Sequence, residues 1–428
     1  MDREKLFNRL GAMPALESDF AALTATGGRL VGSRSEAAAR QWLVRRLNAI
    51  QGIRFDTFRF PFTAWASLES SLELFDAGSA RNYPCHPLYW SGETPVGGLE
   101  AGLVDIGRGT EEEFRAHAAA IPGNLVIVRH EYPFSDRTIH RRVKYKRARE
   151  GAAAGFVIVN HLPGNGLVTG SCGEDSPKNI PAIGVSYETG ARLSAAQNAR
   201  ARLRITTRRQ PAIGVNLIAE VPGQTDEWVV VCAHYDGHDV AQSALDNATG
   251  VVSAMTVFEN FCPLIANLRR GLRLILFTAE ESGLLGSKLY VQSLTDAERN
   301  RIAVVLNLDT LAGSPRFSCL TSGFPELEGF VAETGRRAGL EFRSYPTLLR
   351  NSDHFNFAQA GIPALRLVAG FDEPEGGARL ILTEADRSNL VQRDELKLGT
   401  QVAGALVWSA LIWPSQICAH RPSAAQPS

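Results

Sequence analysis

The sequence predicts an α/β protein with a mostly parallel or mixed central sheet that helices cover on both faces. Three short runs rich in β-branched and other apolar residues, at 227–236, 272–279 and 304–309, have the composition of buried strands. Stretches with helical spacing follow the first two runs, at 248–261 and 283–294. Strands that alternate with helices in this way are typical of a sheet covered on both faces.

The chain before these strands is expected to belong to the same domain. Apolar residues recur at helical spacing within residues 1–50, where a glycine-punctuated turn at 27–33 precedes a helix. Residues 53–76 alternate between apolar and polar side chains, which predicts edge strands. Residues 1–95 are therefore interpreted as the N-terminal part of the main domain, which continues over 206–415.

The segment 96–205 differs in character and is interpreted as a smaller, β-rich module inserted into the larger domain. Strand-like runs at 103–106 and 124–128 alternate with glycine turns, and a basic helical patch covers 144–150. The segment contains no cluster of residues that would suit a metal. At the other end of the chain, residues 416–428 are rich in Pro, Ser and Ala, and we expect them to be disordered.

Length and charge exclude several classes of function. A chain of 428 residues suggests two or three domains, and its 45 basic residues balance its 45 acidic ones. This balance gives no electrostatic footprint for nucleic acid or an anionic membrane, and we find no apolar run that suggests a bilayer span. The six cysteines are scattered without a CxxC pair, and the first residues do not resemble a secretory leader. We therefore expect a cytoplasmic protein with no nucleic-acid or membrane partner.

One histidine and several carboxylates follow the predicted strands. In an open α/β sheet, ligands bind just beyond the carboxyl ends of the strands, so these side chains should converge at one edge. That arrangement suits zinc, and it makes the chain a metallohydrolase by prediction. The converging residues are His234, Asp236, Asp246, Glu280, Glu281 and Asp309.

Each of these residues has an ordinary structural explanation when it is taken alone. A His-x-Asp pair is often structural, adjacent glutamates are usually a solvated helix face, and Asp246 with Asn247 would be a helix cap. Taken together at the ends of buried strands, they are hard to explain as coincidence. Two carboxylates at the end of an apolar strand are costly to bury, and two cations would relieve that cost.

The same segments resemble peptidase family M28, the zinc aminopeptidases that also include glutamate carboxypeptidase and transferrin-receptor branches. The resemblance covers roughly residues 210–415, and residues 17–65 look like the family's N-terminal portion. The inserted segment resembles a protease-associated (PA) domain, through residues 151–155 and 180–185. The matching segments are His234-Tyr235-Asp236, residues 244–250, residues 277–287, Asn307-Leu308-Asp309, Ser352-Asp353-His354 and residues 361–364.

The resemblance implies a role for each residue. His234 and Asp309 would bind one zinc, Asp246 would bridge two ions, and Glu281 would bind the other zinc. Glu280 would be the general base that takes a proton from a zinc-activated water, and Asp236 would orient His234. The implied activity is proteolysis of the aminopeptidase type, which is removal of an N-terminal residue from a peptide or hydrolysis of a related small amide.

The chain departs from the family's pattern at one ligand. The family has a histidine in a His-Thr-x-x-Asp motif near the C-terminus, whereas this chain has Leu382 before Thr383. Leucine cannot bind zinc, so the site holds one or two ions per chain depending on what replaces the histidine. His354 is the first candidate for the replacement, and His238 is the next.

Three functions remain open at this stage. The leading one is a zinc aminopeptidase, because Glu280 and Glu281 are intact. The alternatives are a single-zinc transferase similar to glutaminyl cyclase and a non-catalytic, M28-like binding protein, which the loss of a histidine at Leu382 would favour. The PA-like insert could restrict access to small peptides or mediate contacts in a homodimer, and the sequence does not choose between these.

Overall fold

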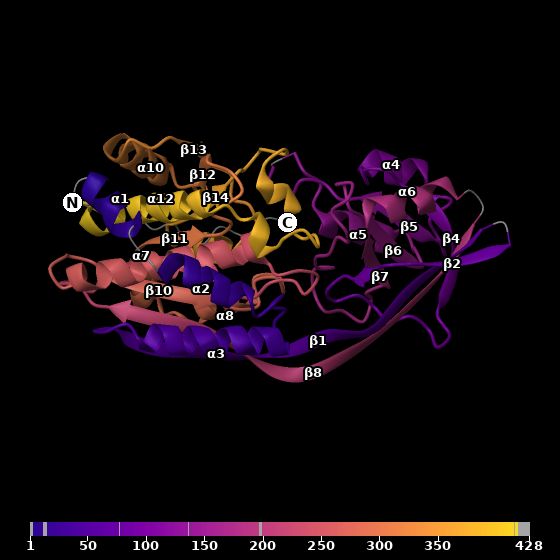
Figure 1. Ribbon diagram of the computed structural model, residues 1–428, viewed down its shortest axis with the longest axis horizontal. Helices are drawn as coiled ribbons and strands as arrows, with labels where there is room; N and C mark the ends of the chain where they lie inside the picture. Colours follow the sequence, from indigo (N-terminus) through magenta and orange to yellow (C-terminus); the bar gives the residue numbers. More distant parts are fainter. Residues whose placement is uncertain are drawn as a thin grey trace.

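The computed structural model describes residues 3–11, 15–76, 78–135, 137–196, 199–414 and 416–417. The chain forms a larger and a smaller lobe, joined by two long strands (Figure 1). Almost all of the tail predicted to be disordered, residues 416–428, lies outside the described residues.

The larger lobe contains a mixed sheet, as the sequence predicts. Its strands are β1 (Arg54–Asp76), β8 (Arg200–Val221), β9 (Trp228–His234), β10 (Gly271–Phe277), β11 (Ile302–Leu308), β12 (Phe317–Leu320), β13 (Phe342–Tyr345) and β14 (Ala364–Ala369). The order is β13-β12-β14-β11-β9-β10-β8, and β1 pairs with the other edge of β8. The central strands β10, β9, β11 and β14 are parallel to one another, so their carboxyl ends meet at one edge.

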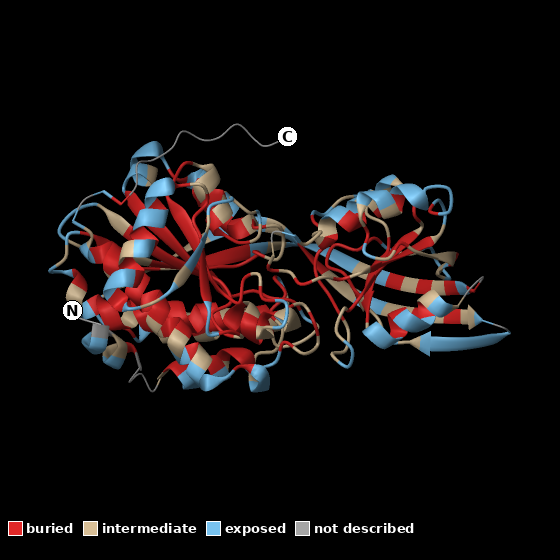
Figure 2. Cartoon of the chain, turned by 90° about the horizontal axis from the view of Figure 1, so that it is seen from above, coloured by how far each residue is buried: buried red, intermediate tan, exposed pale blue. Residues whose placement is uncertain are grey.

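Helices cover both faces of this sheet because the central strands are buried on both sides. In β9, Val229 and Val231 belong to one apolar core, and Val230 and Cys232 belong to the other. Figure 2 shows the resulting buried interior of the larger lobe. The first core is closed by α1 (Arg3–Gly11), α2 (Ala15–Thr24), α3 (Arg34–Asn48), α7 (Thr249–Ile265), α10 (Pro325–Ala338) and α12 (Arg393–Ile412). The second is closed by α8 (Leu285–Ser293) and α11 (His354–Gln359), and α9 (Asp296–Asn300) contacts β11.

The long strands β1 and β8 carry the chain from one lobe to the other. They pair antiparallel from Arg54 opposite Glu220 to Phe75 opposite Arg200, so the edge strands predicted over 53–76 are one continuous strand. Their far ends enter the smaller lobe, where Leu72 packs in the core. That core therefore includes residues before position 96, although the predicted boundary itself stays a prediction.

The smaller lobe contains the continuation of this sheet beyond β8, flanked by helices. Its strands follow β8 in the order β4-β5-β6-β7-β3, and β4 to β7 are parallel. The runs predicted at 103–106 and 124–128 correspond to β4 and β5. The elements are β2 (Ser79–Tyr83), β3 (His86–Pro87), β4 (Leu99–Asp105), β5 (Leu125–Arg129), β6 (Gly155–Val159), β7 (Ala182–Val185), α4 (Glu111–Ala116), α5 (Arg141–Glu150) and α6 (Tyr187–Ala195).

One stretch, Ala244–Ile265, is long and apolar enough to cross a membrane by length and composition alone. It comprises a π-helical turn, η1 (Ala244–Ala248), and α7. Its most apolar window is 83% buried inside the protein, where α7 packs against β9 and β10. Such burial is what a core helix of a globular domain shows, so the stretch is weak support for a membrane span.

Candidate metal centre

The predicted site residues lie together at the carboxyl ends of three adjacent strands. His234 is the last residue of β9, Asp309 follows β11, and Glu280 and Glu281 follow β10. Asp246 lies in η1, the turn that leads into α7. Since β11, β9 and β10 are neighbours and parallel, their ends bring these side chains to one edge, as the sequence predicts.

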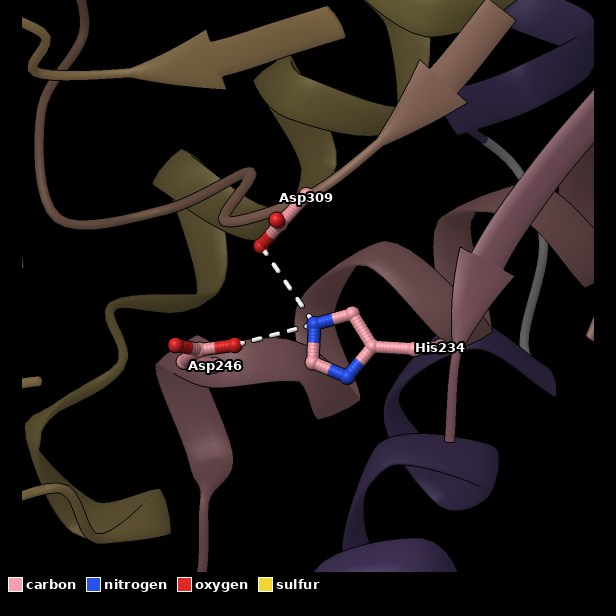
Figure 3. Close-up of side chains that lie close together, drawn as sticks. All are labelled: His234, Asp246 and Asp309. Carbon is pink, nitrogen blue, oxygen red and sulfur yellow. Dashed lines mark ion pairs between the residues drawn. The ribbon is translucent and has the colours of Figure 1, made fainter. Parts of the chain in front are cut away.

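His234, Asp246 and Asp309 form a compact cluster (Figure 3). His234 Nε2 lies 3.1 Å from Asp246 Oδ1 and 3.7 Å from Asp309 Oδ1, and one ligand atom of each residue lies within 4.8 Å of the others. His234 Nε2 and Asp246 Oδ1 are buried without a well-aligned hydrogen bond. Buried polar atoms are normally paired, so a cation at this cluster would satisfy both atoms, and nitrogen and carboxylate ligands suit zinc.

The charged groups of this site shift one another's pKa values. Burial, together with the nearby charges of Asp309 and Glu281, raises the pKa of Asp246 to about 6. Burial alone would also raise the pKa of Asp309, but the Arg366 guanidinium, 3.1 Å from Asp309 Oδ2, holds that pKa well below its usual range. Nothing in the sequence indicates that Arg366, the single charged residue of β14, would meet Asp309. Asp309 is thus kept ionised, as a metal ligand must be.

Asp236 connects His234 to the two glutamates. His234 Nδ1 lies 3.2 Å from the main-chain carbonyl oxygen of Asp236, and 3.7 Å from its carboxylate. That carboxylate accepts hydrogen bonds from the backbone N–H groups of Glu280 and Glu281, at 3.1 and 3.2 Å. Asp236 therefore contacts the His234 ring chiefly through its backbone, and its side chain fixes the turn that presents both glutamates.

The two glutamates have different surroundings, as expected for adjacent residues at a strand end. Glu281 Oε2 lies 2.8 Å from His238 Nε2, and although burial would raise the pKa of Glu281, His238 brings it below its usual value. Burial raises the pKa of Glu280 well above its ordinary value, against the opposing effect of His234, and the charge of Glu281 adds to the rise. Glu281 is thus suited to bind a cation, and Glu280 to accept a proton.

A second cavity adjoins the cluster on the Glu281 side. It is lined by His238, Asp246, Glu281 and Leu382, among others. The atoms Glu281 Oε1 and His238 Nε2 are buried without a well-aligned hydrogen bond among the described residues. Leu382, which replaces the family's last histidine, therefore faces the same space as His238.

His354, the first candidate for the missing ligand, lies elsewhere. It is fully buried at the start of α11, and burial together with the charge of Arg366 lowers its pKa to about 3. It lines neither the cavity beside Glu281 nor the cleft above the cluster. Of the two candidates for the missing ligand, His238 lines the cavity beside Glu281 and His354 does not.

The loop that carries His238 is held by the glycine-punctuated turn near the N-terminus. The buried Arg29 guanidinium donates to the carbonyl oxygens of Tyr235, Gln242 and Ser243, at 2.7, 2.8 and 2.8 Å. Gly28 packs so closely that a Cβ there would lie 2.3 Å from the His238 carbonyl oxygen. The sequence marked this turn, but it did not reveal that the turn supports the site.

Asp386 supports Asp246 from the other side. Its carboxylate accepts hydrogen bonds from the backbone N–H groups of Leu245 and Asp246, at 2.6 and 3.3 Å. Burial raises the pKa of Asp386 to about 7. Asp386 ends the Thr-x-x-Asp segment that follows Leu382, so the signal for it was present in the sequence although no role was predicted.

A narrow cleft above the cluster separates the two lobes. Its cavity volume is about 80 Å³. The larger lobe contributes Glu280, Asp309 and Arg366, and the smaller lobe contributes Phe134, His140, Arg141 and Arg142. A substrate that reached the cluster would therefore touch both lobes.

Comparison with known proteins agrees with this architecture. The profile of peptidase family M28 matches residues 216–407, and that of the PA domain matches residues 97–193. Together the two matches include the strand ends that carry the cluster and most of the smaller lobe.

Relatives with similar sequences include proteins named as bacterial and fungal aminopeptidases. Aminopeptidase YwaD of Bacillus subtilis is 25% identical over 90% of this chain and 82% of its own length. The probable leucine aminopeptidase 2 of Arthroderma benhamiae is 33% identical, but the match covers 41% of this chain and 35% of that protein. The chain therefore spans about a third of the length of the fungal relatives that it matches.

Solved structures share the fold across both lobes. A peptidase M28 precursor from Shewanella amazonensis superposes with a TM-score of 0.81 at 20% identity, covering 99% of this chain and 98% of that one. BSAP, a zinc aminopeptidase from Bacillus subtilis, superposes with a TM-score of 0.72 at 22% identity, covering 94% and 97%. Residues 216–407, which include the strand ends that carry the cluster, thus match peptidase family M28, and residues 97–193 match the PA domain.

Proposed function

We propose that the protein is a two-zinc hydrolase of the aminopeptidase type, which removes N-terminal residues from peptides. The observation that carries this proposal is the position of His238, whose Nε2 lies 2.8 Å from Glu281 Oε2 in a cavity that Asp246 also lines. His238 thereby supplies a nitrogen ligand on the side where Leu382 supplies none. Glu281 and His238 therefore offer ligands for a second zinc ion, beside the position that His234 and Asp309 offer for the first.

The residues divide into two positions that share one carboxylate. His234 and Asp309 would hold the first zinc, and Glu281 and His238 the second. Asp246 lies between them, 3.1 Å from His234 Nε2 and on the wall of the second cavity, so it would bridge both ions. The three carboxylates bring like charges together in a buried place, and two divalent cations offset that repulsion.

Zinc, when bound, lowers the pKa of a coordinated water to roughly 7 and polarises a carbonyl group. The protein's part is to place a base beside that water. Glu280 is buried in the cleft, its pKa is raised well above the usual value, and Asp236 fixes its backbone. A carboxyl group with a raised pKa takes up a proton more readily at neutral pH, so Glu280 is the proposed general base.

The aminopeptidase type of reaction rests on the relatives, whose names are those of aminopeptidases. The narrow cleft between the lobes supports a short peptide or a peptide end as the substrate. We also propose that the protein works in the cytoplasm, which the free state of the five cysteines in the described residues supports.

Metal content and turnover test the proposal together. Purified protein should contain two zinc ions per chain by elemental mass spectrometry and should hydrolyse aminoacyl fluorogenic amides. The Glu280→Gln protein should keep both ions and lose turnover, because an amide cannot take the proton. An active Glu280→Gln protein would refute this mechanism. One ion per chain, with ammonia released from N-terminal glutamine peptides, would support the single-zinc transferase, and protein without zinc or turnover would support a binding function.

A further inference from the structure

The sheet of the larger lobe ends at a strand whose outer edge is open. β13 pairs with β12 and with no other strand among the residues that the structure describes. The carbonyl oxygen of Tyr345 accepts a hydrogen bond from the N–H of Thr321 at 2.9 Å, so it points toward the β12 side. Since the N–H and C=O groups of successive residues point to alternate edges of a strand, those of Phe342 and Ser344 point to the open edge. An open edge of this kind can pair with a further strand.

A groove runs along this edge, between β13 and α10. Figure 1 shows α10 beside β12 and β13 on the larger lobe. The volume of the groove is about 470 Å³, and its apolar lining includes Val331 and Ala332 of α10, together with Leu340 and Phe342. The Phe342 ring packs against Gly335 of α10, where a Cβ would lie 3.3 Å from it. Among the described residues, the groove shares no lining residue with the cleft above the metal cluster, so it is a separate surface.

Two exposed charges of opposite sign flank Phe342 in the sequence. Glu341 and Arg343 are two residues apart in an extended segment, so their side chains lie on the same face of the sheet. Within the described part of the chain, Glu341 has no ion-pair partner. Arg343 Nη1 lies 3.5 Å from the carboxylate of Glu373, to which Arg316 lies closer. The guanidinium of Arg343 has five N–H donors and therefore retains some for a second carboxylate.

We propose that β13 pairs with β13 of a second copy of this chain, which joins two sheets into one across a two-fold axis. Such an axis sets the two strands antiparallel, and an axis beside Phe342 places Glu341 opposite Arg343 of the second copy. The same axis places Arg343 opposite the Glu341 of that copy, so one surface supplies both charge pairs. Phe342 meets its own copy through the outward N–H and C=O groups, and the two rings cover the apolar groove.

The charges favour a single register of this pairing. An axis one residue earlier would set Glu341 opposite Glu341, and an axis one residue later would set Arg343 opposite Arg343. Both alternatives place like charges face to face. The inference goes beyond the proposed hydrolase function and does not depend on it, because the groove and the cleft are separate.

Sedimentation of the native protein over a range of concentrations tests the association itself. We expect a dimer with a dissociation constant below about 100 μM, because specific interfaces of ordinary size bind in the micromolar range or more tightly. A protein that remains a monomer at about 100 μM would overturn the proposal and leave the open edge to a different partner.

Charge reversal tests the pairing of Glu341 with Arg343. The Glu341→Arg protein should have a dissociation constant raised by about 10–30-fold, because two attractive pairs become repulsive. The double variant Glu341→Arg/Arg343→Glu exchanges the charges and should recover most of the affinity. Glu112→Arg, at an exposed position on α4 of the smaller lobe, is the control and should leave the dimer unchanged. An unchanged dissociation constant for Glu341→Arg would mean that the dimer forms through another surface.

Cross-linking tests the register without altering a charge, which matters because Arg343→Glu also brings a carboxylate near Glu373. Directly opposite residues of a hydrogen-bonded antiparallel pair have Cα atoms about 5.5 Å apart, within the span of a disulfide. Phe342→Cys should therefore give a disulfide-linked dimer with oxidised glutathione, above the baseline of the native protein. Leu340→Cys is the control, since its two copies would lie about 14 Å apart along the strands. A cross-link through Leu340→Cys alone, or through neither variant, would refute the proposed pairing.

Discussion

The two halves of the metal centre are built from different kinds of sequence. In the half around His234 and Asp309, each ligand directly follows or ends a buried strand, so the sheet itself sets its position. In the half around Glu281, the partner is His238, which lies on a loop fixed by Arg29 and Gly28, about 200 positions earlier in the chain. The comparison teaches that a short sequence pattern can predict the position of a ligand at a sheet edge. The position of a ligand on a loop depends on contacts with residues that are distant in sequence.

Asp246→Asn should have the largest effect, because Asp246 belongs to both halves. An amide of the same shape removes the negative charge that would bridge the ions. We expect both zinc ions to be lost and activity to fall by about three orders of magnitude, since several kcal/mol of charge stabilisation disappear. Elemental analysis and turnover measure this effect, and circular dichroism verifies the fold. Loss of only one ion would show that the halves are independent.

His238→Ala should affect the second half alone. The first zinc should remain, and the affinity for the second should fall by roughly 100-fold or more, because even the outer partners of metal ligands contribute about 10–100-fold. The matched comparison is His354→Gln, which should leave both ions bound, since His354 lines neither cavity. Titration of the metal-free proteins with zinc measures both affinities. If His354→Gln weakens binding of the second zinc and His238→Ala does not, His354 is the ligand.

The sequence predicted much of the fold and the first half of the site for a physical reason. Apolar runs such as 229–233 report burial directly, and parallel strands must end at one edge, so His234, Glu281 and Asp309 converge whatever the loops do. The choice between His238 and His354 was different. His238 lies close in sequence to His234 and Asp236, and His354 belongs to another segment that resembles the family; the path of the loop that carries His238, set by a buried arginine, is what places His238 at the cavity.

Arg366 illustrates a second limit. Its charge keeps Asp309 ionised, yet within the sequence it is a single arginine in an apolar strand. Nothing in the local pattern says which carboxylate it will meet, because the partner comes from the neighbouring strand β11. Pairings of this kind arise from packing between elements, which a single sequence does not display.

Arg29→Lys tests the support of the loop and should have a moderate effect. Lysine keeps the charge but cannot reach three carbonyl oxygens at once, so buried acceptors lose their donors. We expect the free energy of unfolding to fall by about 2–4 kcal/mol, and the second zinc to bind more weakly than the first. Chemical denaturation and zinc titration measure these changes. Arg45→Lys, at an exposed position, is the control. If the Arg29→Lys protein binds the second zinc with unchanged affinity, the turn does not support the metal site.

Leu382→His should have little effect alone and a clear one in the absence of His238. Leu382 lines the same cavity as Asp246 and Glu281, and its backbone has a φ of 65°, in the left-handed region that histidine adopts more readily than leucine. Under the two-zinc proposal, His238 supplies the nitrogen ligand of the second ion in the native background, so zinc content should stay at two ions. In the His238→Ala background, the new histidine should recover most of the lost affinity, because it supplies a nitrogen from the opposite wall. Zinc titration of the single and double variants gives the coupling between the two positions. Independent effects would mean that His238 and residue 382 do not serve the same ion, and coupled effects would mean that the chain has moved one ligand from one loop to another.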